Sequence, residues 1–295
     1  MAKMEKKNKE ELLIKDWTDF SKAYGVISSG RNRVFVRMTL GLEELHPIDV
    51  LIIAQFAIWL QAKGGDLTLA VNTSNREYIK SIGLLDFCNA NIHFPSTLED
   101  ISSRSAMPIK RVNRETMTSY IIATGQYLKS LCPNKDLQML QVCLSELINN
   151  VYDHSNSPID AYVFCEYYAN SNSIFIVVSD LGIGIASSVN SFRSTKGLMP
   201  LSTVECLKWA VKENSTTRSL PHNLGKGLDV LNSFIQANHS SWQILTNDVS
   251  MRADPDEINY EKNPISGFIG TIVNLIVRVS NLPEIDVEED NEMDW

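Results

Sequence analysis

Two polar side chains stand one helical turn apart in a stretch whose apolar residues predict a buried helix. Apolar residues recur at three- and four-residue spacing through residues 137–152, which is typical of an amphipathic helix. Glu146 and Asn150 are four residues apart, so both project from one edge of this helix. A carboxylate there can act as a general base, and an amide oxygen can bind a hard cation. The alternative is that both side chains simply face solvent.

A second polar signal follows a strongly apolar strand, which is predicted at residues 174–178. Asp180, Gly182 and Gly184 come directly after it. A carboxylate at the end of a strand can accept a hydrogen bond from an exocyclic amine, and glycines let a flat base approach the backbone. An ordinary turn is the alternative interpretation, because Asp and Gly are common turn residues.

A third signal is rich in glycine and precedes a helix that is predicted to run to about residue 237. It consists of Gly225, Lys226, Gly227 and Leu228. Amide groups at the start of a helix favour phosphate, and a lysine adds positive charge. The spacing of a P-loop and the fingerprint of a dinucleotide-binding fold are both absent. A glycine-rich helix start without a ligand is the alternative.

In this order, the three signals resemble the motifs of the GHKL family of ATP-binding proteins, which includes anti-sigma-factor serine kinases and sensor histidine kinases. The resemblance covers residues 115–280. The stretch SELINNVYDHS is similar to the family's N box, DLGIGI to its G1 box and GKGL to its G2 box. Thr271, within GFIGTIVNLIV, matches a Gly-Thr pair at the start of the family's last strand.

The resemblance implies a role for each of these residues. Glu146 would be the catalytic base, and Asn150 would bind both the nucleotide and Mg²⁺. Asp180 would accept a hydrogen bond from the adenine amino group of ATP, and Thr271 would help to hold the base. Residues 187–223 would form a lid over the nucleotide. The remaining cofactor-binding positions would be Gly182, Gly184, Gly225, Lys226, Gly227 and Leu228.

The N-terminal part of the chain is predicted to alternate strands and helices. Strands are expected at residues 34–38 and 66–71, and helices at residues 48–63 and 75–84. On the stretch LQAKGGDLTLAVNTSNREYIKSIGLLDF, residues 31–95 resemble a STAS domain, the partner module of anti-sigma-factor systems. That family's phosphoacceptor serine has no counterpart at LHPIDV, so this unit is expected to dock a partner rather than to accept phosphate.

The predicted fold class is α/β (α+β), with the STAS-like unit followed by a GHKL (Bergerat-type) α/β sandwich. The sandwich, at residues 115–280, is expected to hold a mixed sheet covered by helices on one face. Residues 1–30 are expected to form an N-terminal extension with one helix reaching about residue 24. Residues 96–114 are predicted to be a linker, and residues 281–295 a disordered acidic tail.

Composition narrows the function classes. The 295 residues, 44% of them hydrophobic, suit two ordinary domains. A formal net charge of −8 argues against sequence-independent binding of nucleic acid. The five cysteines are widely spaced and form no CxxC pair, which favours reduced thiols in a cytoplasmic protein. The longest apolar run, at residues 50–60, is short and contains Gln55, so no membrane span is expected.

The predicted function is therefore that of an ATP-binding regulatory protein acting on a protein partner. It would hydrolyse ATP, or transfer the γ-phosphate as a serine/threonine kinase of the anti-sigma type. The alternative is a non-catalytic, nucleotide-gated switch that uses the STAS-like unit as its docking surface. The sequence does not identify the partner, and it leaves open whether the protein forms a homodimer.

Overall fold

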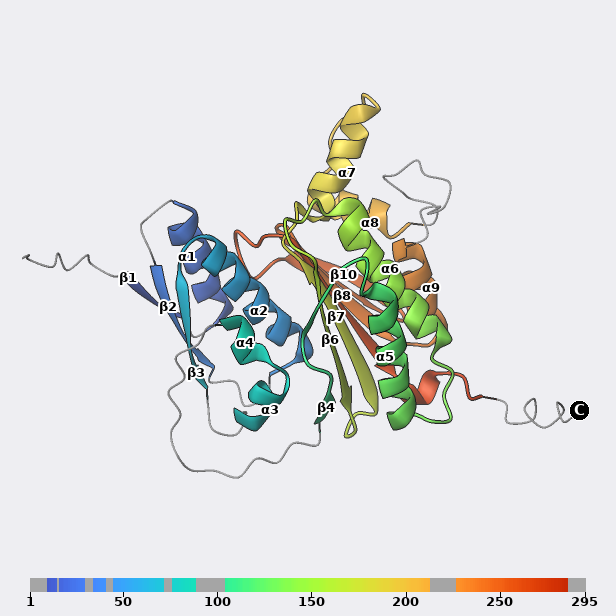
Figure 1. The fold of residues 1–295 in the computed structure, drawn as a ribbon. Helices are drawn as coiled ribbons and strands as arrows, with labels where there is room; N and C mark the ends of the chain where they lie inside the picture. Colours follow the sequence, from blue (N-terminus) through green and yellow to red (C-terminus); the bar gives the residue numbers. More distant parts are fainter. Residues whose placement is uncertain are drawn as a thin grey trace, which may run out of the picture.

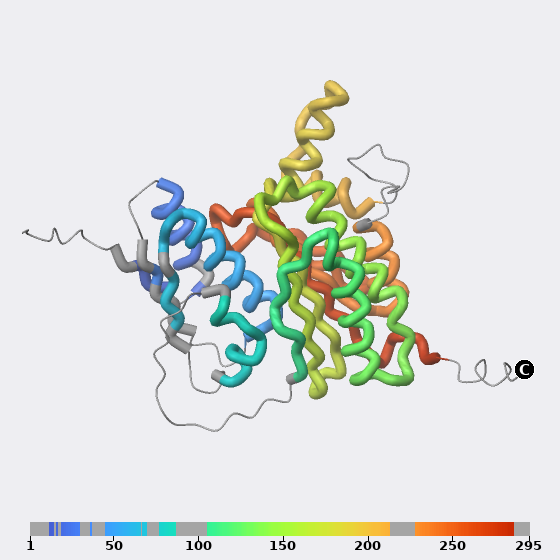
Figure 2. Tube along the Cα trace, viewed as in Figure 1, coloured from blue at the N-terminus to red at the C-terminus, as the bar shows by residue number. Residues whose placement is uncertain are grey.

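The computed structural model describes residues 10–14, 16–29, 34–40, 45–71, 76–88, 104–212 and 227–285. Within these residues, the strands form one sheet of three strands and one of eight (Figure 1). The chain trace in Figure 2 shows the N-terminal unit, in blue, lying directly beside the larger sheet. The two parts therefore meet over an interface, and are not joined by the chain alone.

The smaller sheet is parallel, with the strand order β1-β2-β3. The prediction of an N-terminal extension with a single helix is wrong for residues 10–14, because β1 forms there and pairs with β2. The helix that was expected to reach about residue 24 is present as α1, which begins at Trp17. The helix and two strands expected around residues 34–71 are confirmed. The elements of this unit are β1 (Glu10–Ile14), α1 (Trp17–Ser28), β2 (Val34–Leu40), α2 (Pro47–Ala62), β3 (Asp66–Val71), α3 (Arg76–Ser81) and α4 (Leu84–Cys88).

The larger sheet has the strand order β10-β9-β8-β11-β7-β6-β4, and β5 also pairs with β6. Every pairing between its described strands is antiparallel, so the expected mixed sheet is wrong. The expected linker is wrong for residues 104–112, which add two short strands beside β6. The strands are β4 (Arg104–Ala106), β5 (Lys110–Val112), β6 (Ala161–Tyr168), β7 (Ser173–Asp180), β8 (Ser241–Thr246), β9 (Val249–Asp254), β10 (Glu257–Lys262) and β11 (Thr271–Arg278).

Three helices cover one face of the larger sheet: α5 (Met117–Leu131), α6 (Gln138–His154) and α9 (Gly227–Ala237). The apolar stripe predicted from the sequence is the buried side of α6. Two further helices, α7 (Gly184–Thr195) and α8 (Thr203–Ala210), pack on each other around Ala186, Val189 and Cys206. Figure 1 shows α7 projecting away from the body of the protein.

Helix α2 closes the opposite face of the larger sheet. It is buried on almost every side, between the smaller sheet and strands β6, β7 and β11. The expected cover of helices on one face is therefore found in α5, α6 and α9, and the N-terminal unit covers the other face through α2. One continuous apolar core joins α1 and α2 to side chains of the larger sheet, among them Tyr162, Phe164, Val177, Leu245 and Ile272.

Two other expectations concern the cysteines and the C-terminal segment. Cys132, Cys143, Cys165 and Cys206 are free and buried, as predicted. Glu284 forms a β-bridge and an ion pair with Lys135, so the described end of the expected acidic tail is attached to the α5–α6 connection. Residues 286–295 lie outside the described residues. In the part of the chain that the structure describes, no helix is long and apolar enough to cross a bilayer.

Because the two sheets share one apolar core, the loss of a large buried side chain from α2 should destabilise both sheets together. Phe56 is fully buried and packs edge-on against Phe20 at 5.1 Å and Tyr24 at 5.3 Å between ring centroids. We expect Phe56→Ala to lower the free energy of unfolding by about 3–5 kcal/mol. Urea denaturation, followed by far-UV circular dichroism, measures this. Ile122→Ala, at a side chain that is 53% exposed, is the control and should change it by less than about 0.5 kcal/mol. A loss confined to a separate, early transition would contradict a shared core.

Candidate functional site

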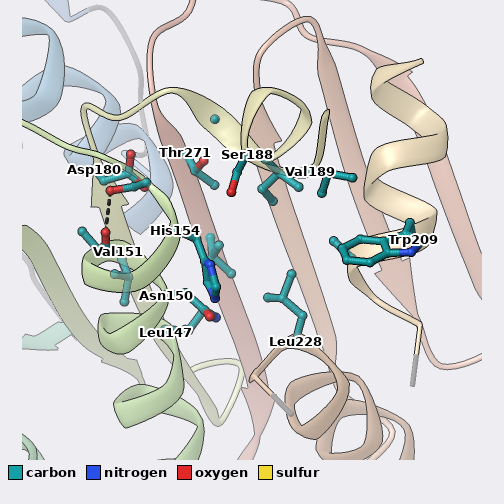
Figure 3. A pocket seen from close by; sticks show the side chains of 16 residues that line it. Leu147, Asn150, Val151, His154, Asp180, Ser188, Val189, Trp209, Leu228 and Thr271 are labelled. Carbon is teal, nitrogen blue, oxygen red and sulfur yellow. Dashed lines mark hydrogen bonds between the residues drawn. The ribbon is translucent and has the colours of Figure 1, made fainter. Parts of the chain in front are cut away.

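A pocket of about 120 Å³ lies between α6, the end of β7, the start of β11 and the helices α7, α8 and α9. Figure 3 shows Asn150 and His154 entering it from α6, Trp209 from α8 and Leu228 from α9, with Asp180 and Thr271 toward the top of the view. Most of the lining is apolar, and it includes Leu147, Val151, Val178, Val189, Leu228 and Val273. A mostly apolar lining with a few polar groups suits a flat ring system that has polar edges.

The pocket brings together residues that are far apart in the sequence. Five of the predicted site residues line it: Asn150, Asp180, Gly184, Leu228 and Thr271. They come from five different elements or loops, so the sequence motifs converge on one place in the fold.

The other predicted site residues lie around this pocket or outside the described chain. Gly182 is in the loop between Asp180 and α7. Glu146 is half-buried one turn before Asn150 on α6, and it is not among the lining residues. Gly227 is the first residue of α9. Gly225 and Lys226, like most of the predicted lid beyond α8, fall outside the described residues.

Asp180 is the buried carboxylate of the pocket, with a side chain only 5% exposed. Burial raises its pKa to about 7, and hydrogen bonds from the amides of Gly182 and Thr271 oppose the rise. The Gly182 amide lies 2.6 Å from Asp180 Oδ1. Near neutral pH, a ligand that donates a hydrogen bond here would stabilise the ionised carboxylate.

The glycines after Asp180 are needed for contacts within the protein. A Cβ on Gly182 would lie 2.1 Å from the carbonyl oxygen of Ser155. Gly184 has a φ of +78°, and a Cβ there would lie 2.4 Å from Asn247 Oδ1. The sequence suggested that these glycines admit a ligand, and Gly184 does line the pocket. Both glycines also let the loop pack against the residues just after α6 and just after β8.

Two residues that the sequence did not single out hold the start of α7. Thr246 Oγ1 accepts a hydrogen bond from the Ile185 amide at 3.0 Å and lies 3.2 Å from Thr271 Oγ1. Asn247 accepts from the Ala186 amide through Oδ1 and donates to the Ile183 carbonyl through Nδ2. No local motif marks them, because their role depends on the pairing of β8 with β11, which places Thr246 opposite Thr271.

Gln55 is a third residue of this kind, and it comes from the N-terminal unit. Its side chain is 2% exposed, and its Nε2 donates to the backbone carbonyls of Asp180 at 2.8 Å and Ile269 at 2.5 Å. A signal was present in the sequence, since Gln55 is the single polar residue of the apolar run at residues 50–60. This pattern indicated a polar side chain within a buried helix, but it did not indicate which groups would form hydrogen bonds with that side chain.

Asn150 and Glu146 differ in how they are placed. Asn150 Nδ2 is buried and has no hydrogen-bond partner among the described residues. A rotation of this amide by 180° exchanges Nδ2 with Oδ1, so the same position can supply an oxygen ligand. Burial raises the pKa of Glu146, and the nearby charge of Asp153 adds to the rise. Across the described residues, no group of three or more His, Cys, Asp or Glu could hold a metal ion.

No protein-family model matches this chain, and no curated protein matches it either. The interpretation of the pocket therefore depends on its residues and their geometry.

The buried carboxylate makes stability depend on pH. Because the pKa of Asp180 is raised in the folded protein above about 3.9 in the unfolded chain, its stabilising effect is complete below about pH 4 and is lost as the pH rises to about 7. We expect the wild type to lose up to about 1.4 kcal/mol per pH unit relative to Asp180→Asn across this range. Urea denaturation of both proteins from pH 4 to pH 8 measures the difference. Parallel stability curves would contradict the assignment.

Proposed function

We propose that the pocket binds ATP with Mg²⁺ and that the protein uses this nucleotide to act on a protein partner, by hydrolysis or by transfer of the γ-phosphate. One observation carries the proposal. Asp180, Thr271 and Asn150 come from three elements that are distant in sequence, and they meet in one mostly apolar pocket. Their arrangement fits the roles that the GHKL resemblance assigns to them.

The pocket offers what an adenine base requires. Apolar side chains such as Leu147, Val189 and Val273 can cover the faces of the ring. The exocyclic amine would donate to the Asp180 carboxylate, which is already held by the Gly182 amide. The hydroxyl groups of Thr246 and Thr271 are within hydrogen-bond distance of each other and can orient toward a ring nitrogen.

The phosphates would leave the pocket toward Asn150 and the start of α9. Asn150 would contribute one oxygen to Mg²⁺, and the other ligands would be phosphate oxygens and water, as is usual for this ion. When bound, Mg²⁺ would neutralise charge on the phosphates. Glu146, whose pKa is raised by burial, would take a proton from water or from a hydroxyl group of the partner.

A second candidate function is a nucleotide-gated switch without turnover. It is favoured by the position of Glu146, which lies outside the pocket lining, and by the direct contact of the N-terminal unit with the pocket strands through Gln55. In this case the STAS-like unit would be the surface that docks the partner. Nucleotide binding would shift the protein between two partner-binding states.

Binding of nucleotide should stabilise the protein. At MgATP concentrations about 100 times the dissociation constant, we expect the free energy of unfolding to increase by about 2.7 kcal/mol. In Asp180→Asn, the affinity should fall by about 10- to 100-fold, because the variant loses a hydrogen bond to a charged group. Thermal unfolding with and without MgATP, together with calorimetric titration, measures both effects. An unchanged melting temperature of the folded wild type at saturating MgATP would overturn the nucleotide site.

The reaction itself depends on Glu146. Glu146→Gln keeps the size of the side chain and removes the base, so we expect it to bind ATP normally and to lose turnover by at least about 100-fold. Incubation with γ-labelled ATP and host lysate separates the candidate functions. A labelled protein indicates a kinase, release of free phosphate alone indicates an ATPase, and neither product indicates a switch. Wild-type turnover in Glu146→Gln would show that another group is the base.

A further inference from the structure

Gln55 joins the N-terminal unit to the wall of the pocket. It lies in the middle of α2, yet its Nε2 donates to carbonyls that are 125 and 214 residues further along the chain. Its Oε1 is buried without a partner among the described residues. The orientation of the side chain is therefore set by the two hydrogen bonds that it donates.

The two carbonyls belong to the segments that carry the proposed adenine contacts. Asp180 ends β7, and Ile269 lies two residues before Thr271, the first residue of β11. Gly270, which lies between Ile269 and Thr271, has no room for a side chain. A Cβ there would lie 1.9 Å from the Asp180 carbonyl oxygen and 3.0 Å from Gln55 Nε2. Gln55 therefore bonds to the end of β7 and to the segment before β11 at a place where the two backbones are packed too closely for a side chain on Gly270.

The N-terminal unit also holds the loop that leads into β11. Ser21 Oγ on α1 accepts from the Ser266 amide at 2.7 Å and donates to the Pro264 carbonyl at 3.3 Å. Together with Gln55, these bonds fix the loop between β10 and β11 at two places. The position of Thr271 thus depends on how the N-terminal unit is docked.

We propose that Gln55 is a positioning residue of the nucleotide site, through which docking of the N-terminal unit sets the affinity for the adenine base. The inference rests on the proposed function of the pocket. None of the residues that line the pocket comes from α2, so Gln55 acts through the backbone of Asp180 and Ile269. Because coupling between two sites is reciprocal, nucleotide binding must in turn stabilise the docked unit. A partner that displaced α2 would release the nucleotide.

Gln55→Met tests the proposal, because it keeps the length of the side chain and removes both donors. We expect the dissociation constant for MgATP to rise about tenfold and the preference for ATP over GTP to fall. Tyr168→Phe is the matched control. It removes the hydrogen bond from Tyr168 Oη to the Leu45 carbonyl, 3.3 Å long, which ties the start of α2 to the opposite end of the sheet. We expect this control to bind MgATP as tightly as the wild type does.

Amide hydrogen exchange of the wild type provides a measurement that does not depend on the folding of a variant. MgATP should slow the exchange of the α2 amides, although α2 does not line the pocket, and this protection should be weaker in Gln55→Met. Two results would overturn the inference and leave the nucleotide site standing. In the first, the wild type binds MgATP but the α2 amides gain no protection. In the second, Gln55→Met binds MgATP with unchanged affinity and unchanged preference for the base. If the folded wild type does not bind MgATP, both the inference and the nucleotide site are overturned.

Discussion

The structure depends on the burial of one helix that is apolar all round. A surface helix keeps a polar face, whereas α2 presents apolar side chains in every direction and must be covered on every side. The smaller sheet covers one side, and β6, β7 and β11 cover the other. This requirement joins the two sheets into one core. It also brings a residue of the N-terminal unit to the strand ends that form the pocket.

Close approach of backbones is the second constraint at the pocket. The loop after β7 lies so near the end of α6, the turn after β8 and the start of β11 that three positions, Gly182, Gly184 and Gly270, have no space for a Cβ. Fixed backbones hold the carboxylate of Asp180 in a buried position, where its ionised form is disfavoured. A ligand that donates a hydrogen bond to the Asp180 carboxylate would stabilise its ionised form. The pocket is thus formed in advance around a buried carboxylate that is held by the backbone amides of Gly182 and Thr271.

The spacing of apolar residues predicted those helices and strands whose conformation depends mainly on residues close in sequence. β3 begins and ends as expected, and α6 buries the stripe that its spacing indicated. β1 and the edge strands β4 and β5 were missed, because short strands acquire their conformation from a partner that is distant in sequence. Five residues of the predicted motifs line one pocket: Asn150, Asp180, Gly184, Leu228 and Thr271. The roles of Thr246, Asn247 and Gln55 could not be predicted, since they arise from strand register and from packing between the two units.

The burial of α2 also bears on the order in which the chain can fold during synthesis. The helix is complete at residue 62, whereas the strands that cover its second side end at residues 168, 180 and 278. Most of the chain must therefore leave the ribosome before the apolar surface of α2 can be covered by its native neighbours. Until then, this surface is available to chaperones or to wrong partners. Formation of β11, the last strand of the larger sheet, thus also completes the burial of α2 in the N-terminal unit.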